Sequence, residues 1–142
     1  VVDDYNNIYQ VKRGINISCN NDGNKNYIIS GIENRIEQII ANLLDNAISF
    51  SEDNKNIEVK ISQNTNQQVI INIIDEGQGF KEKDTSKIFK RFYSNRPDKF
   101  GQHSGLGLNI VKNLVELHKG LINASNRYQK KGANIEIIFP KS

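Results

Sequence analysis

The amino-acid sequence predicts an α+β sandwich of the α/β class, in which helices cover one face of a mixed β-sheet. Two observations support this fold class. Segments with strand-like and helix-like hydrophobic spacing alternate along the chain, and two strand-like segments follow the last helix. Helices that alternate with strands bury their apolar stripes on the sheet that the strands form, so the order of the elements implies the layers.

Two helices are predicted from apolar side chains that recur at helical spacing. The first covers residues 33 to about 49, and the second covers residues 106–118, with Gly120 expected to end it. A shorter helical signal lies at residues 85–92. The apolar stripes consist of Ile36, Ile39, Ile40, Leu43, Leu44 and Ala47 in the first helix and of Ile110, Val111, Leu114 and Val115 in the second.

Strands are predicted where apolar residues alternate with polar ones or form a short apolar run. Ile57, Val59 and Ile61 alternate with polar neighbours, which is typical of a half-buried strand. Residues 69–74 are apolar at nearly every position and are predicted to be buried on both faces of the sheet. Further strands are predicted at residues 15–19, 27–30, 121–126 and 134–139, with a turn rich in Asn and Gly at 20–26.

Length and composition indicate one globular domain. The chain has 142 residues, of which 25% are charged and 37% hydrophobic, and this is enough for one core. Residues 1–13 are polar and are expected to be a linker from a preceding domain, with the domain itself at 14–142. No apolar run approaches the roughly 20 residues of a membrane span, and no signal peptide is recognised. We therefore expect a cytoplasmic domain that does not itself enter the membrane.

Charge and cysteine content argue against several other classes of protein. The net charge of +3 is mild and lacks the clustering that is typical of nucleic-acid binding, so we expect no nucleic-acid partner. Cys19 is the single cysteine, which excludes an internal disulfide and fits a reducing compartment. His103 and His118 are far apart in the sequence, so a structural zinc site is not expected.

Asn42 and Asn46, in the segment NLLDNA at 42–47, lie one turn apart on the first predicted helix. Both amides therefore project from one face of that helix. An amide oxygen can ligate Mg²⁺ and adds no negative charge beside a triphosphate. Two exposed asparagines in an Asn-rich chain are the alternative, and the pattern alone leaves it open.

The segment DEGQG at 75–79 follows the predicted buried strand. Asp75 must find hydrogen-bond donors at that position, because an unpaired buried carboxylate is costly. An adenine amino group would be one such donor, and Gly77 and Gly79 would let the backbone approach a flat ring. The alternative is an ordinary glycine-containing turn with an acid that caps it.

The segment SGLGL at 104–108 opens the second predicted helix. Glycines at a helix start leave backbone N–H groups accessible, and the helix dipole favours an anion there. The spacing matches neither a Walker A loop nor a Rossmann turn. A phosphate-binding helix terminus and a flexible hinge both remain open.

Taken in order, these segments resemble the catalytic ATP-binding domain of sensor histidine kinases, in the GHKL superfamily with Hsp90, type II topoisomerases and MutL. The resemblance covers about residues 30–140 and implies the Bergerat fold, with about five mostly antiparallel strands, about three helices and a flexible ATP lid at about 80–104. NLLDNA resembles the N box of this family, and DEGQG resembles its G1 box. IFKRFY at 88–93 resembles the F box, and SGLGLNIVK at 104–112 resembles the G2 box. GANIEIIFP at 132–140 is similar to the closing segment, in which a glycine precedes the last strand.

The resemblance implies a magnesium and base site on the first two motifs. Asn46 would ligate Mg²⁺, and Asn42 would support the metal and the phosphates; these two are the expected catalytic residues. Asp75 would accept a hydrogen bond from the adenine N6 amino group, with Gly77 and Gly79 shaping the base pocket.

The resemblance also implies roles for the lid and the residues around it. Gly105 and Gly107 would form the lid hinge and offer backbone N–H groups to the phosphates, while Phe89 and Phe92 would anchor the lid. Arg91 and Arg96 are the lid cations that we favour for contact with phosphate or a partner. The remaining expected nucleotide contacts are Phe50, Phe80, Tyr93, Leu106 and Leu108.

Two positions depart from the commoner family pattern. Ser49 stands where many relatives carry a basic residue that can reach phosphate, and Phe50 stands where tyrosine is frequent. Another lysine or arginine, such as one from the lid, would have to supply the missing positive charge.

The implied enzyme is a protein-histidine kinase whose phospho-acceptor lies outside this chain, since neither His103 nor His118 has the surroundings of an acceptor. The domain would bind Mg·ATP and present the γ-phosphate to a histidine on a separate dimerisation domain, with a response regulator downstream and an inner-membrane sensor as a candidate parent protein. A regulatory nucleotide-binding module (a pseudokinase) is one alternative. A superfamily ATPase of another class is the second, and the F box and the absence of a glutamate at position 42 argue against it.

Overall fold

The structure is a mixed β-sheet with its helices on one face. The computed structural model describes residues 1–21, 28–80, 88–89 and 107–141. The elements in chain order are α1 Val2–Arg13, β1 Asn16–Asn21, α2 Glu33–Phe50, β2 Asn56–Gln63, β3 Val69–Asp75, α3 Gly107–Leu117, β4 Leu121–Asn126 and β5 Ala133–Phe139.

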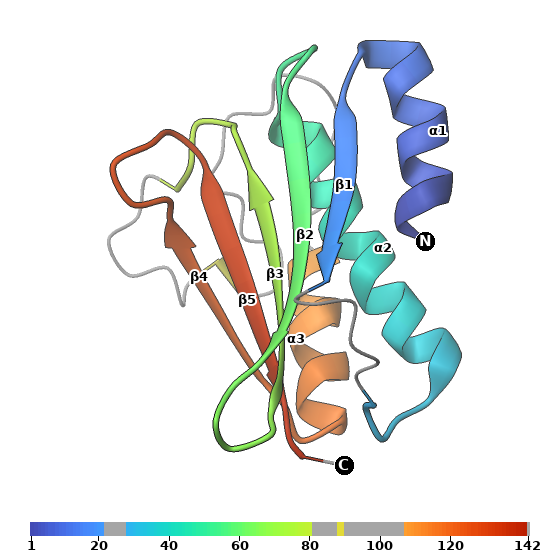
Figure 1. Cartoon of the computed structure of the whole chain (residues 1–142), viewed down its shortest axis with the longest axis vertical. Helices are drawn as coiled ribbons and strands as arrows, with labels where there is room; N and C mark the ends of the chain where they lie inside the picture. Colours follow the sequence, from blue (N-terminus) through green and yellow to red (C-terminus); the bar gives the residue numbers. More distant parts are fainter. Residues whose placement is uncertain (22–27, 81–87, 90–106, 142) are drawn as a thin grey trace.

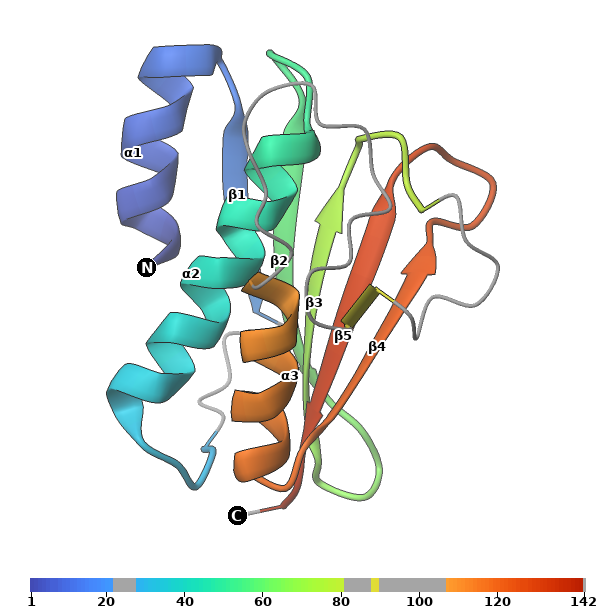
Figure 2. The same ribbon diagram turned by 180° about the vertical axis from the view of Figure 1, so that it is seen from behind.

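The strand order in the sheet is β1-β2-β3-β5-β4. β1 runs parallel to β2, and the other neighbouring pairs are antiparallel. Figures 1 and 2 show α1, α2 and α3 on the same side of this sheet. The predicted α+β sandwich, with a mixed and mostly antiparallel sheet, is confirmed.

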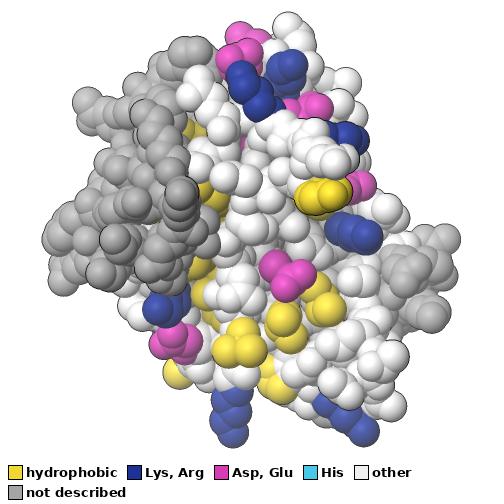
Figure 3. Space-filling model, turned by 90° about the vertical axis from the view of Figure 1, so that its left-hand side faces the viewer, with side chains coloured by type: hydrophobic (Ala, Val, Ile, Leu, Met, Phe, Trp, Pro, Cys, Tyr) yellow, Lys and Arg dark blue, Asp and Glu magenta, His cyan; other side chains and the backbone are white. Residues whose placement is uncertain are grey.

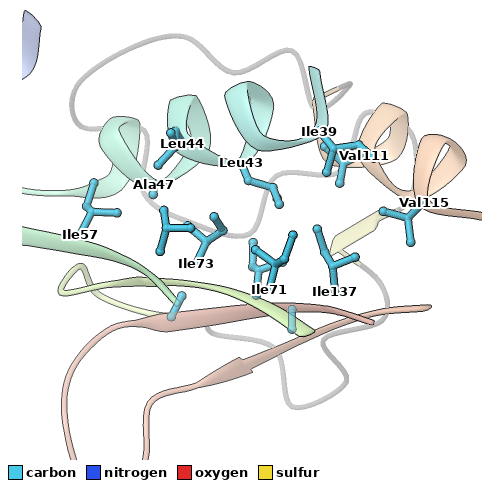
Figure 4. Packing of buried hydrophobic residues seen from close by; sticks show 14 of the residues in the cluster. Ile39, Leu43, Leu44, Ala47, Ile57, Ile71, Ile73, Val111, Val115 and Ile137 are labelled. Carbon is cyan, nitrogen blue, oxygen red and sulfur yellow. The ribbon is translucent and has the colours of Figure 1, made fainter. Parts of the chain in front are cut away.

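The hydrophobic core lies between the sheet and the pair α2 and α3. Every second side chain of β3 and β5 is buried, because successive side chains of a strand point to opposite faces. Figure 4 shows Ile71, Ile73 and Ile137 of these strands facing Leu43 and Val115 of the helices. Full burial of such a side chain is worth about 1.5–3 kcal/mol, so this layer holds α2 and α3 in place over the centre of the sheet.

The outer face of β3 differs from the sequence prediction. Ile70, Asn72 and Ile74 are only half-buried, although the apolar run at 69–74 predicted burial on both faces. The described helices cover the opposite face of the sheet (Figure 1). On the outer face, which no described helix covers, Asn72 Nδ2 donates a hydrogen bond of 3.1 Å to Asn134 Oδ1. The prediction of a strand buried on both faces is therefore wrong.

The segment that we predicted to be a linker forms the helix α1. Its side chains Val2, Tyr5 and Tyr9 pack against the core. Gly14 ends the helix in the left-handed conformation, with φ of 67°, and its N–H donates to the Gln10 carbonyl at 3.0 Å. The sequence analysis missed this helix because the segment is mostly polar, and two of the three side chains that pack against the core are tyrosines. Its connection to a preceding domain, and the boundary at residue 14, remain predictions.

The end of α3 differs slightly from the expected one. Lys119, with φ of 59°, is the left-handed residue that closes the helix, and the N–H of Gly120 donates to the Val115 carbonyl at 2.9 Å. A Cβ on Gly120 would lie 2.8 Å from the carbonyl oxygen of Ile138. Close approach to β5 is therefore the reason that this position requires glycine.

Three minor predictions lie partly outside the described residues. Of the predicted strand at 27–30, residues 28–30 are described and form no strand. The predicted turn at 20–26 begins inside β1, and its remaining part is not among the described residues. Of the helical signal at 85–92, only Ile88 and Phe89 are described, and both are buried.

Candidate functional site

Asp75 ends β3 as a buried carboxylate whose exposed fraction is 3%. Its Oδ1 accepts a hydrogen bond of 2.9 Å from the backbone N–H of Gly77 and one of 3.2 Å from the backbone N–H of Ala133. One donor comes from the following turn and the other from the start of β5. Both fix the direction of the carboxylate, and they satisfy the expectation that Asp75 must find hydrogen-bond donors.

Asn46 of α2 lies at the same end of the sandwich as Asp75. Figure 4 shows Ala47 of α2 above Ile57 and Ile73, and the strand register pairs Ile57 with Asp75. Asn46 precedes Ala47 and is buried, whereas Asn42, one turn earlier, is half-buried. The fold thus brings the first two predicted motifs to one region.

The amide of Asn46 carries an unusual feature for a buried group. Its Nδ2 atom is shielded from solvent and has no hydrogen-bond partner among the described residues. Nearly all buried polar atoms are hydrogen-bonded, so an unpartnered one requires an explanation. A ligand acceptor such as a phosphate oxygen would supply the partner that Nδ2 lacks, and the amide oxygen of the same side chain is the atom that could ligate Mg²⁺.

The turn after Asp75 is held in place by a residue that the sequence analysis missed. Asn126, the last residue of β4, accepts a hydrogen bond of 2.6 Å from the Phe80 N–H and donates one of 3.1 Å to the Phe80 carbonyl. Gly79 has φ of 78°, and a Cβ on it would lie 2.5 Å from Asn126 Oδ1. Nothing in the sequence distinguishes Asn126 from the many other asparagines of this chain.

Gly132 is the second site residue whose role was not predicted. It has φ of 129°, and a Cβ on it would overlap the backbone carbonyl of Asp75. The N–H of Arg127 donates to the Gly132 carbonyl at 3.0 Å and closes the hairpin between β4 and β5. The glycine ahead of the final strand was the available signal, since glycine suits both a positive φ and a close backbone contact.

The other predicted nucleotide contacts belong to several elements of the fold. Phe50, Phe80 and Phe89 are buried in or beside the core, and the Phe89 carbonyl accepts a hydrogen bond of 3.1 Å from Asn109 Nδ2 of α3. Gly107 begins α3, and a Cβ on it would meet no atom within 4 Å in the part of the chain that the structure describes. Leu108 is half-buried. Phe92, Tyr93, Gly105, Leu106, Arg91, Arg96 and His103 lie outside the described residues.

His118, at the end of α3, has a structural environment. Its Nε2 accepts a hydrogen bond of 3.2 Å from the Ile32 N–H, and its Nδ1 lies 2.7 Å from the Leu114 carbonyl, so the neutral ring with its proton on Nδ1 satisfies both contacts. The ring also meets Phe139 edge-on, with 6.5 Å between the ring centroids. These contacts tie the end of α3 to the start of α2.

In the part of the chain that the structure describes, no group of three or more His, Cys, Asp or Glu side chains could hold a metal ion. Figure 3 shows that, on the side of the molecule that it presents, several hydrophobic side chains lie in the lower half, with charged side chains of both signs around them and at the upper end. None of the described helices is long and apolar enough to cross a membrane.

The family model of histidine kinase-, DNA gyrase B- and HSP90-like ATPases matches residues 31–142. The matched range includes α2, β3, α3 and both final strands, and therefore every described residue of the candidate site. The chain belongs to this family. Its members are ATPases, so the predicted ATP-binding class is confirmed.

Relatives within this family are sensor kinases. The chain is 43% identical over 108 residues to the sensor protein ChvG of Rhizobium meliloti (strain 1021), an alignment that covers 75% of this chain and 19% of ChvG. The solved catalytic domain of the histidine kinase ThkA matches with a TM-score of 0.82 and 26% identity, covering 99% of this chain and 88% of that one. The sequence prediction of a histidine-kinase ATP-binding domain is confirmed, and the chain spans about a fifth of the length of ChvG.

Two further solved structures share the fold. One is full-length ShkA in complex with AMPPNP, with a TM-score of 0.79 and 24% identity over 98% of this chain and 28% of that one. The other is ThkA in complex with the response regulator TrrA, with a TM-score of 0.80 and 24% identity over 99% of this chain and 38% of that one.

Proposed function

We propose that this domain binds Mg·ATP and presents the γ-phosphate to a histidine on a separate dimerisation domain of the same kinase. One observation carries the proposal: the oriented, buried carboxylate of Asp75 lies at the same end of the sandwich as Asn46, whose buried Nδ2 has no hydrogen-bond partner among the described residues. The carboxylate suits a base with an exocyclic amino group, and the amide suits a metal–phosphate group. Membership of the ATPase family supports the pairing of these two features in one nucleotide site.

Each side chain then has a defined task. Asp75 accepts the adenine N6 hydrogen bond, and the backbone of Gly77 and Gly79 lies along the base. Asn46 holds Mg²⁺, which supplies charge neutralisation on the phosphates, and Asn42 supports it from one turn earlier. Gly107 offers N–H groups at the start of α3, where the helix dipole favours phosphate.

Catalysis by this domain is chiefly a matter of orientation. Phosphoryl transfer between bound groups requires alignment of donor and acceptor and stabilisation of charge, and little covalent chemistry from the protein. Because the acceptor histidine lies on the dimerisation domain, the isolated chain should bind ATP with little or no turnover. The sensor-protein relatives support a sensor kinase as the parent, and the ThkA–TrrA complex supports a response regulator as the downstream partner. That the parent is a membrane sensor with this domain on its cytoplasmic side is part of the same proposal.

The test combines this chain, ATP labelled on the γ-phosphate and the histidine-bearing dimerisation domain of its own kinase. Label should appear on the histidine of the dimerisation domain only when all three are present, and it should disappear when Asn46 is changed to Ala. Binding of ATP without any transfer of label would favour a regulatory nucleotide-binding module. Rapid release of labelled phosphate by this chain alone would favour an ATPase of another class.

A further inference from the structure

Asn126 makes a reciprocal pair of hydrogen bonds with the main chain of one distant residue. Its Oδ1 accepts from the Phe80 N–H at 2.6 Å, and its Nδ2 donates to the Phe80 carbonyl at 3.1 Å, across 46 positions of sequence. The amide of Asn126 thus pairs with both backbone groups of Phe80, in the way that the backbone of a neighbouring strand pairs with a residue in a sheet. Such a pair fixes the position and the direction of that backbone segment.

The geometry of the segment before Phe80 depends on the same side chain. Gly79 has φ of 78° and lies so close to Asn126 that a Cβ would approach its Oδ1 to 2.5 Å and the Gly132 carbonyl to 3.2 Å. The Phe80 ring is buried, with an exposed fraction of 6%. The turn that follows Asp75 is therefore fixed at both ends, by the Gly77 N–H on Asp75 Oδ1 and by Asn126 on Phe80.

We propose that Asn126 is a positioning residue for nucleotide binding, which holds the backbone of residues 77–80 in the conformation that receives the base. It acts through this backbone, since its two described hydrogen bonds are both made to Phe80. The inference rests on the proposed function, because it assumes that the base lies against this turn.

The experiment compares Mg·ATP binding by this chain, measured by calorimetry, for the wild type, Asn126→Ala and Asn123→Ala. Asn123 is the matched control, because it is an exposed asparagine of the same strand β4. Loss of two neutral hydrogen bonds predicts that Asn126→Ala weakens ATP binding about tenfold, and that Asn123→Ala leaves it within about twofold. Binding of ADP should weaken by the same factor as binding of ATP, because the effect is on the base end of the nucleotide.

A second readout separates positioning from general stability. In the complete kinase, Asn126→Ala should raise the KM for ATP about tenfold and leave kcat within about twofold, since Asn126 is remote from the reacting atoms. Asn126→Asp keeps the size of the side chain and the acceptor for the Phe80 N–H, but it replaces the donor to the Phe80 carbonyl by a negatively charged oxygen; it serves as the comparison if the alanine variant does not fold. Hydrogen exchange on the wild type gives an independent check, because the Phe80 amide should be protected.

The outcomes distinguish the two proposals. If the wild type does not bind ATP, the proposed function is wrong. If the wild type binds ATP and a folded Asn126 variant binds it equally well, or if the Phe80 amide exchanges as fast as an unbonded one, the positioning role of Asn126 is wrong while the proposed function stands.

Discussion

The backbone N–H of Ala133 lies 3.2 Å from Oδ1 of Asp75, and this hydrogen bond joins the start of β5 to the end of β3. The two residues are 58 positions apart in the sequence. Gly132 makes the approach possible, because any side chain there would overlap the Asp75 carbonyl. The direction of the carboxylate therefore depends on the absence of a Cβ one residue before β5.

Gly132→Ala should destabilise the domain strongly. The new Cβ must displace the backbone of Asp75, and alanine is strained at the φ of 129° that this position adopts. Strain and overpacking each cost about 1–3 kcal/mol, so we expect the free energy of unfolding to fall by about 2–6 kcal/mol in urea titrations.

The matched control is Gly107→Ala. A Cβ at Gly107 meets no atom of the described residues within 4 Å, so the free energy of unfolding should change by no more than about 0.5 kcal/mol. Equal effects of the two substitutions would contradict the close contact between Gly132 and Asp75.

Arg13→Ala should loosen the end of α2. The Arg13 guanidinium donates at 2.9 Å to the carbonyl of Ile48, in the last turn of α2, and at 2.6 Å to the carbonyl of Ser51, the residue that follows the helix. Carbonyl groups at a helix end lack the N–H groups of a further turn, so side-chain donors stabilise them. Hydrogen bonds from a charged donor are worth about 1.5–3 kcal/mol, so urea titrations should show a loss of about that size.

Asp53→Ala separates this capping from the ion pair that Arg13 also makes. Asp53 lies 2.7 Å from Arg13 Nε, but its side chain is 61% exposed, and such surface pairs contribute about 0–1 kcal/mol. A loss from Asp53→Ala as large as that from Arg13→Ala would contradict the capping role.

Tyr5 should make stability depend on pH in the alkaline range. Burial, together with the hydrogen bond of 2.9 Å that its hydroxyl donates to Asp45, raises the pKa of Tyr5 from 10.0 to about 12. Because the folded pKa lies above the ordinary one, the contribution to stability is complete below pH 10 and is lost as the pH rises from 10 to 12.

The measurement compares the free energy of unfolding near pH 8 and near pH 11 for the wild type and Tyr5→Phe. The wild type should lose more stability between the two pH values than Tyr5→Phe does. Tyr128→Phe, at an exposed position, should behave as the wild type. The same loss in the wild type and in Tyr5→Phe would exclude a raised pKa at Tyr5.

Asn46→Ala should affect binding far more than folding. The Asn46 Nδ2 atom has no hydrogen-bond partner among the described residues, so its removal forfeits no described hydrogen bond. We expect the melting temperature to change little, while Mg²⁺-dependent ATP affinity falls more than about tenfold, as befits loss of a metal ligand. A large fall in melting temperature with unchanged ATP affinity would assign Asn46 a structural role instead.

The sequence predicted the features that local patterns encode. Alternation identified β2, helical spacing identified α2 and α3, and the segment DEGQG placed Asp75 at the end of a buried strand. These features depend on neighbours within a few positions, so one sequence is enough to predict them.

Other features depend on contacts between distant parts of the chain. Asn126 and Arg13 act on backbone groups 46 and 35 positions away, and nothing near them in the sequence indicates a partner. The outer face of β3 was mispredicted for the same reason: Ile70 and Ile74 are as apolar as their inward neighbours, and only the placement of the helices leaves them half-buried.

The most direct test of the nucleotide site is calorimetric titration of Mg·ATP into the wild type, Asp75→Asn and Glu76→Gln. Asparagine keeps an oxygen for the N–H groups of Gly77 and Ala133, so the turn should persist while the charged acceptor is lost. Glu76→Gln removes the same charge from the adjacent position and is the matched control. Loss of a hydrogen bond to a charged group costs about 1.5–3 kcal/mol, so Asp75→Asn should weaken ATP binding about ten- to a hundredfold and Glu76→Gln should not. Equal affinity of the wild type and Asp75→Asn would contradict the assignment of Asp75 to the base.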